Sequence, residues 1–96
     1  MKNLDELILR VQKTQHGFLD IQKAADEVIS EYSMQESLRL AKQLFASDAY
    51  QARSLATFIL GHFAADSVES IEFLKKQVSL DSDWRVQEIN LGKSIR

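Results

Sequence analysis

The sequence contains no cysteine and no proline, and only three of its 96 residues are glycine. Without cysteine the chain can form no disulfide, no thiolate metal site and no thiol nucleophile, which excludes zinc fingers and thiol enzymes. Proline and glycine are the residues that tight turns between strands most often require. Their scarcity therefore favours a protein built from long, uninterrupted helices.

The chain also lacks a long apolar run. Its longest nearly apolar stretch, Leu55–Ala65, is interrupted by Thr57 and His62 and is far shorter than the ~20 residues needed to span a bilayer. The first residues, MKNLDE, are charged and polar and do not form the apolar region of a signal peptide. We therefore expect a cytoplasmic protein without membrane contact, in which residues 55–65 form a buried helix.

The overall composition, 45% hydrophobic and 27% charged, is that of an ordinary globular protein. A chain of this length forms one domain and buries about 65% of its unfolded surface. The formal net charge of −2 argues against a surface that is basic throughout. The C-terminal segment nevertheless carries a net charge of +2, because five cations stand against three acids there: Lys75, Lys76, Arg85, Lys93 and Arg96 against Asp81, Asp83 and Glu88.

Apolar residues recur at helical spacing in six segments. Their ranges are 4–11, 18–32, 38–45, 52–63, 68–78 and a last one that opens at Trp84. Helix starts are marked by short polar residues followed three positions later by an acid or an amide, the pattern of a capping box. Four such pairs are present: Asn3 with Glu6, Ser33 with Glu36, Asp48 with Gln51, and Asp66 with Glu69.

These signals predict an all-α domain of about six helices in stacked antiparallel pairs, roughly 3–32, 33–65 and 66–96. The fourth helix is apolar around most of its circumference, which is typical of a helix enclosed by others. It is the expected central helix. Gly61 lies inside it, and because glycine costs roughly 1 kcal/mol in a helix relative to alanine, a tight helix crossing is expected there.

The later helices show an internal repeat. The residues Glu36-Ser37-Leu38 return as Glu69-Ser70-Ile71, a shift of 33, and the next helices begin at Tyr50 and Trp84, a shift of 34. This period is typical of helix-pair solenoids, in which each pair buries its apolar face against the next.

Four short motifs in this half carry a family resemblance. They are AKQLF at 41–45, YQAR at 50–53, AADS at 64–67 and, most specific, DWRVQE at 83–88. Through them the stretch 41–88 resembles the DNA alkylation repair family, the HEAT-like-repeat DNA glycosylases of bacteria. The resemblance implies an α-α superhelix, of which this chain supplies the N-terminal portion, wrapped around duplex DNA.

The resemblance also implies a chemistry, the excision of N3- or N7-alkylated purines. The alkylated base leaves readily, so the enzyme mainly places negative charge beside a sugar that becomes cationic in the transition state. Trp84 and Glu88 match the tryptophan and the acid of the family, and their i, i+4 spacing puts them on one helix face. Active members have aspartate in place of Glu88, and the family's other tryptophan and its arginine would lie beyond Arg96. We therefore expect a chain that is not competent alone.

Duplex DNA is the expected partner, contacted through its phosphates by Arg85, Lys93 and Arg96. We expect neither a cofactor nor a metal, because no phosphate-binding glycine loop and no metal-ligand spacing is present. The last helix lacks a following helix to cover its apolar residues, which predicts self-association through the C-terminal end.

Each candidate also has an ordinary structural interpretation. Trp84 is then a packing aromatic, Glu88 a solvated acid and the three cations plain surface, while Arg53 pairs with a nearby acid such as Asp48. The alternative function is accordingly a non-catalytic HEAT-like module that binds protein. Electrostatics separates the two, because a DNA-binding arm must gather its cations on one face.

Overall fold

The computed structural model describes residues 4–13, 18–83 and 85–87, and these residues form helices and turns without any strand. The elements are α1 (Leu4–Gln12), α2 (Phe18–Glu31), α3 (Met34–Phe45), α4 (Tyr50–His62), α5 (Val68–Lys76) and a short 3-10 helix, η1 (Val78–Leu80). Residues 85–87 are again helical, where the sequence predicts the sixth helix. The expected fold class, all-α with HEAT-like helix pairs, is confirmed.

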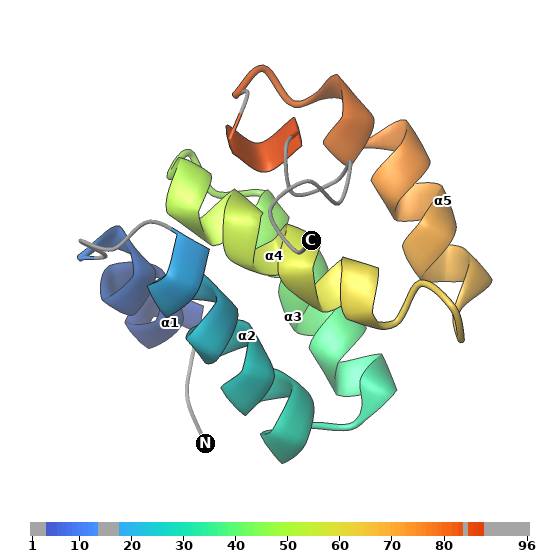
Figure 1. The fold of residues 1–96 in the computed structure, drawn as a ribbon, viewed down its shortest axis with the longest axis horizontal. Helices are drawn as coiled ribbons and strands as arrows, with labels where there is room; N and C mark the ends of the chain where they lie inside the picture. The colour runs from blue at the N-terminus through green and yellow to red at the C-terminus, as the bar shows by residue number, and fades with distance from the viewer. Residues whose placement is uncertain (1–3, 14–17, 84, 88–96) are drawn as a thin grey trace.

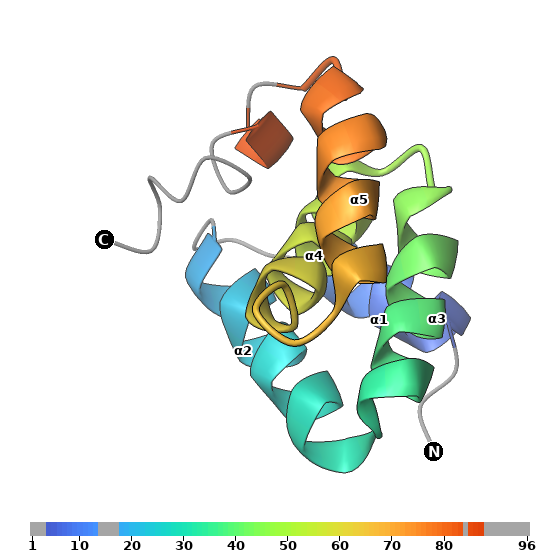
Figure 2. The ribbon, with the colours of Figure 1, turned by 90° about the vertical axis from the view of Figure 1, so that its right-hand side faces the viewer.

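The fourth helix is the centre of the molecule, as its apolar composition predicted. It packs against α1, α2, α3 and α5, and Figure 1 shows it between α2 on one side and α5 on the other. The view from the side shows α3 and α5 on the same flank of α4 (Figure 2). An ion pair between Lys42 Nζ and Glu69 Oε2, 2.6 Å apart, joins those two helices at the surface.

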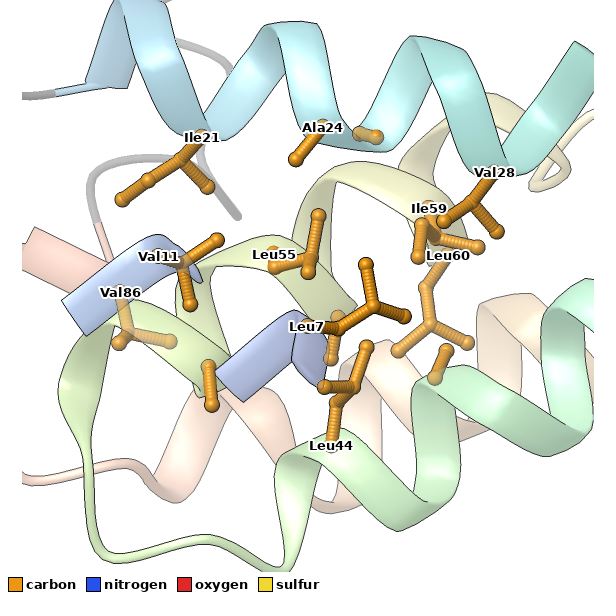
Figure 3. Close-up of a cluster of buried hydrophobic side chains, with 14 of the residues drawn as sticks. Leu7, Val11, Ile21, Ala24, Val28, Leu44, Leu55, Ile59, Leu60 and Val86 are labelled. Carbon is orange, nitrogen blue, oxygen red and sulfur yellow. The ribbon is translucent and has the colours of Figure 1, made fainter. Parts of the chain in front are cut away.

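One apolar core runs along α4 and holds the helices together (Figure 3). Leu55, Ile59 and Leu60 of α4 are completely buried, and buried residues of α1, α2, α3 and η1 belong to the same cluster. Val86, in the last helical stretch, belongs to the same core and is fully buried as well. Burial of such a side chain contributes about 1.5–3 kcal/mol, so Val86 anchors the C-terminal segment to the rest of the domain.

The predicted helix caps are correct at one site, displaced by one residue at a second and absent at a third. Ser33 and Glu36 form the expected capping box at the start of α3. The cap of α5 is Ser67, whose hydroxyl accepts from the backbone N–H of Ser70, and not the preceding Asp66. The N-cap of α4 is Ala49, which has no side-chain acceptor, so the Asp48 pair was wrong. Asn3 lies outside the described residues.

Two further sequence expectations are corrected by the structure. No atom of another helix lies within 4 Å of the position that a Cβ on Gly61 would occupy, and the residue is exposed, so no tight crossing explains it. The fifth helix was expected to reach Val78 but ends at Lys76, and Val78 is buried from η1 instead.

The internal repeat appears in the contacts of two equivalent segments. Arg53 Nη1 donates to the carbonyl of Ser47, in the turn before its own helix, at 3.1 Å. Gln87 Nε2, which is 34 residues later, donates to the carbonyl of Asp81 at 2.9 Å, and Asp81 is 34 residues after Ser47. The two long polar side chains therefore close their preceding turns in the same way, as expected for successive units of a repeat.

Candidate nucleic-acid interface

Most of the predicted site lies beyond the described residues. Trp84, Glu88, Lys93 and Arg96 are all outside them, and of the predicted site residues only Arg85 is described. The structure does define the residues on either side of Trp84, and their contacts show how this part of the chain is held.

Asp83 begins the helical turn that contains residues 85–87. Its backbone carbonyl accepts from the N–H groups of Val86 and Gln87, and its carboxylate accepts from the backbone N–H of Arg85 at 2.9 Å. A short acceptor side chain at this position is the usual N-cap of a helix, because it satisfies an N–H that has no partner within the helix. The aspartate of the DWRVQE motif therefore has a local structural role.

The Arg85 side chain turns back onto the same carboxylate. Its Nε and Nη2 each donate to one oxygen of Asp83, both at 3.0 Å, in the two-pronged geometry that favours arginine over lysine. The hydrogen bonds from this guanidinium, followed by that from the Arg85 N–H, hold the pKa of Asp83 below its ordinary value, although partial desolvation opposes them. The carboxylate thus stays ionised and neutralises much of the Arg85 charge.

The guanidinium of Arg85 also lies over the ring of Tyr50, with its central carbon 3.5 Å from the ring centroid. At this distance the ring quadrupole attracts the cation, a contact that contributes about 0.5–1 kcal/mol at exposed sites. Tyr50 is the first residue of α4. Arg85 therefore connects the last described residues to the central helix.

A second connection, one turn further along α4, is more deeply buried. Arg53 Nε donates to Asp81 Oδ2 at 2.7 Å, and only 4% of the Asp81 side chain and 17% of the Arg53 side chain are exposed. Arg53 was expected to pair with the Asp48 carboxylate; it instead donates to the Asp48 backbone carbonyl at 2.8 Å. The other Asp81 oxygen accepts from the backbone N–H of Asp83 at 2.9 Å.

An open cleft of about 540 Å³ lies where these contacts meet. It is lined by Gln12, Asp48, Ala49, Tyr50, Gln51, Arg53, Asp83 and Arg85. Its two arginines are matched by two aspartates, so the lining carries no net charge. The Arg85 side chain is 42% exposed, so its guanidinium is accessible from the solvent side of the cleft.

Sequence reasoning singled out Arg85 but missed Tyr50, which lies beneath its guanidinium, and Asp81, which pairs with Arg53. The available signal was the repeat, which aligns Tyr50 with Trp84 and Ser47 with Asp81. A smaller cleft of about 220 Å³ was also missed; it lies on the α1–α2 side and includes Arg10, Lys13 and Lys23. Arg10 is paired there with Glu27, whose side-chain hydrogen bond raises the arginine pKa.

In the described part of the chain, no group of histidine and acidic side chains is arranged to hold a metal ion. None of the helices there has the length and apolar character to cross a membrane.

Comparison with known proteins gives one clear relationship. No family model matches the chain, and no curated protein matches its sequence significantly. Among solved structures, the crystal structure of AlkD2 from Streptococcus mutans superposes with a TM-score of 0.82 and is 28% identical. The match covers 97% of this chain and 47% of that one, so the chain spans about half the length of the solved protein. The resemblance to the DNA alkylation repair family of HEAT-like-repeat proteins is therefore confirmed, in fold and over nearly the whole chain.

Proposed function

We propose that this chain is a DNA alkylation repair-like protein that contacts duplex DNA and is not a competent glycosylase by itself. The observation that carries the proposal is the likeness to AlkD2, which extends over 97% of the chain at 28% identity. A shared fold alone does not imply a shared activity, so the site residues must support the same conclusion.

Support from the site comes from the two residues that flank Trp84 in the sequence. Asp83 and Arg85, the residues on its two sides, are fixed by their mutual hydrogen bonds and by the stacking on Tyr50. In the proposed role, Trp84 packs against the sugar and backbone of the lesion, and Glu88 places negative charge beside the deoxyribose. A rigid scaffold is what such a site needs, because misplacement by 1 Å can cost a hundredfold in rate.

The proposed lack of competence has two grounds. Glu88 is one methylene longer than the aspartate of active family members, so its carboxylate would stand differently against the sugar. The chain also spans only 47% of the length of AlkD2, so we do not expect the complete site of that family from it alone. We expect binding of DNA without release of an alkylated base.

One observation favours the second candidate function, a HEAT-like module that binds protein. The two arginines that line the cleft are each paired with an aspartate, Arg85 with Asp83 and Arg53 with Asp81. A surface whose cations are already neutralised attracts DNA less strongly than one whose cations are free.

Titration of a fluorescently labelled duplex at low and moderate salt tests the proposal. We expect weak binding without sequence preference, with an affinity that falls steeply as salt rises because counterions are released. Arg85→Gln should lower the affinity and flatten the salt dependence by about one unit of slope, the contribution of one phosphate contact. Glu88→Gln should preserve or strengthen binding, because its carboxylate repels phosphate.

The matched control is Arg39→Gln, which removes the same charge from an exposed position on α3. It should leave the salt slope unchanged. If the unmodified chain shows no binding even at low salt, the DNA proposal fails and the protein-binding module remains.

A further inference from the structure

Two residues of the first turn of α4 contact the described residues that precede and follow position 84, although they are far from them in sequence. Arg53 reaches Asp81, and Tyr50 lies beneath the guanidinium of Arg85. Because Tyr50 and Arg53 are three residues apart on a helix, their side chains leave the same face. One helical turn therefore makes both contacts.

The contacts form a continuous path through the turn. From Arg53 it passes to the Asp81 carboxylate, which also accepts the backbone N–H of Asp83. From the Asp83 carboxylate it passes to the Arg85 guanidinium and so to the ring of Tyr50. The path leaves α4 at Arg53 and returns to it at Tyr50. In the sequence, Trp84 lies between Asp83 and Arg85. Such a closed path fixes a short segment from both sides.

The comparison of repeat units shows that Arg53 does more than close its own turn. Among the described residues, its counterpart Gln87 donates to two backbone carbonyls that precede its own helical stretch, that of Val78 in η1 and that of Asp81. Arg53 makes the equivalent contact with Ser47 and a further one with the Asp48 carbonyl, and in addition it bonds the Asp81 carboxylate of the following unit. The added ion pair is almost completely buried. It therefore fixes the turn that contains Asp81 relative to α4.

We propose that Arg53 and Tyr50 are positioning residues for the segment that carries Trp84 and Glu88, Arg53 acting through Asp81 and Tyr50 through Arg85. The inference deepens the proposed function and rests on it, since it assigns Trp84 and Glu88 to the site that meets DNA. Neither positioning residue needs to touch the DNA.

Trp84 is the only tryptophan of the chain, so its fluorescence reports on this segment alone. We expect Arg53→Gln to change the emission maximum of Trp84 and to increase its quenching by acrylamide, measured well below the melting temperature with helicity intact. Arg53→Lys should restore part of the signal, because lysine keeps the charge but cannot reach Asp81 and two carbonyls together. Arg39→Gln, with the same loss of charge, should leave the signal unchanged.

Duplex affinity supplies the functional readout. We expect Arg53→Gln to weaken low-salt binding by roughly 3- to 10-fold, the size typical of changes within a coupled network. A purely structural role would lower the melting temperature while leaving the Trp84 signal and the affinity of the folded protein as they were. That result would overturn the proposal.

Two further variants guard against loss of folding. Arg53→Gln combined with Asp81→Asn removes both charges, so no unpaired buried carboxylate remains, and Tyr50→Leu removes only the ring beneath Arg85. Both should move the Trp84 signal in the same direction, and an unchanged signal in both would overturn the proposal. If the wild-type chain fails to bind DNA, the proposed function fails separately, because the fluorescence measurement needs no DNA.

Discussion

At the scale of single residues, Asp83 is the side chain on which the candidate site depends most. It accepts three hydrogen bonds from Arg85, one from the backbone and two from the guanidinium. These bonds favour the ionised form and lower its pKa in the folded state below the ordinary value of 3.8. The carboxylate therefore adds to stability above its unfolded pKa, and this contribution disappears as the pH falls through the lowered folded value.

We predict that Asp83→Asn lowers the stability at pH 7 and that the difference from wild type shrinks as the pH falls below about 4. Asparagine can still cap the helix but cannot form the ion pair with Arg85. Urea denaturation at pH 7 and pH 3 measures the difference. Asp26→Asn, at an exposed position on α2, is the control. A difference for Asp83→Asn that stays constant with pH would contradict the assignment.

The surroundings of Gly61 lead to the prediction that a substitution there increases the stability of the domain. Because a Cβ there would meet nothing within 4 Å, alanine fits without strain and removes the entropic cost of a helical glycine. We predict that Gly61→Ala stabilises the domain by about 0.5–1 kcal/mol, which raises the melting temperature by several degrees in a domain of this size. Thermal melting followed by circular dichroism tests this, and a lower melting temperature would show that the helix end needs glycine.

The residues of the candidate site were predictable to different degrees. Arg85 was singled out as one of the cations of the C-terminal segment, which the sequence alone displays. The contact of Arg85 with Tyr50 and that of Arg53 with Asp81 were not predicted, because they join residues that are 35 and 28 positions apart, and periodicity within one helix contains no information on such pairs. For the same reason Arg53 was assigned to the acid nearest in sequence instead of the one nearest in space.

At the scale of helices, apolar periodicity located the elements well and their ends less well. Apolar residues at helical spacing predicted the positions of α1 to α5, because burial of one helix face involves residues along the whole segment. Helix starts were ambiguous where two cap-forming residues stand side by side, as in Asp66-Ser67. In that pair, Ser67 is the residue that caps α5, so the expected pair was displaced by one position.

The displaced cap gives a test with adjacent residues. Ser67→Ala removes the acceptor for the Ser70 N–H and should destabilise the domain by about 1 kcal/mol, the usual cost of losing an N-cap. Asp66→Ala should lower the stability by no more than a few tenths of that amount, because the Asp66 charge interacts only with the dipole of the helix. Chemical denaturation of both variants compares them directly. Equal costs would mean that the cap is shared between the two residues.

At the scale of the whole molecule, the pattern of helices was enough to predict an all-α, HEAT-like fold, and the likeness to AlkD2 confirms it. Each pair of segments carries an apolar face that only another pair can cover, and this requirement restricts how the pairs stack. Self-association through the C-terminal end stays a prediction. Near that end, Leu80 of η1 is 80% exposed.

We predict that the sedimentation coefficient of the chain rises with protein concentration and that Leu80→Lys weakens this dependence. The charge would have to be buried in any contact that covers Leu80, which is costly without a partner. Leu9→Lys, at a 57% exposed position on α1, is the matched control and should leave the association unchanged. A strictly monomeric wild-type chain at high concentration would count against the prediction.

The central position of α4 has a consequence for the motions of the native state. In a long solenoid the end units open independently, because each touches only its neighbours. Here α4 packs against helices that come before and after it in the chain, so its amide hydrogens are shielded by both halves of the sequence at once. Exchange of these hydrogens with solvent then requires complete unfolding, whereas α1 and α5 can exchange by local fraying. The slowest-exchanging amides should therefore form one continuous run along the middle of the sequence.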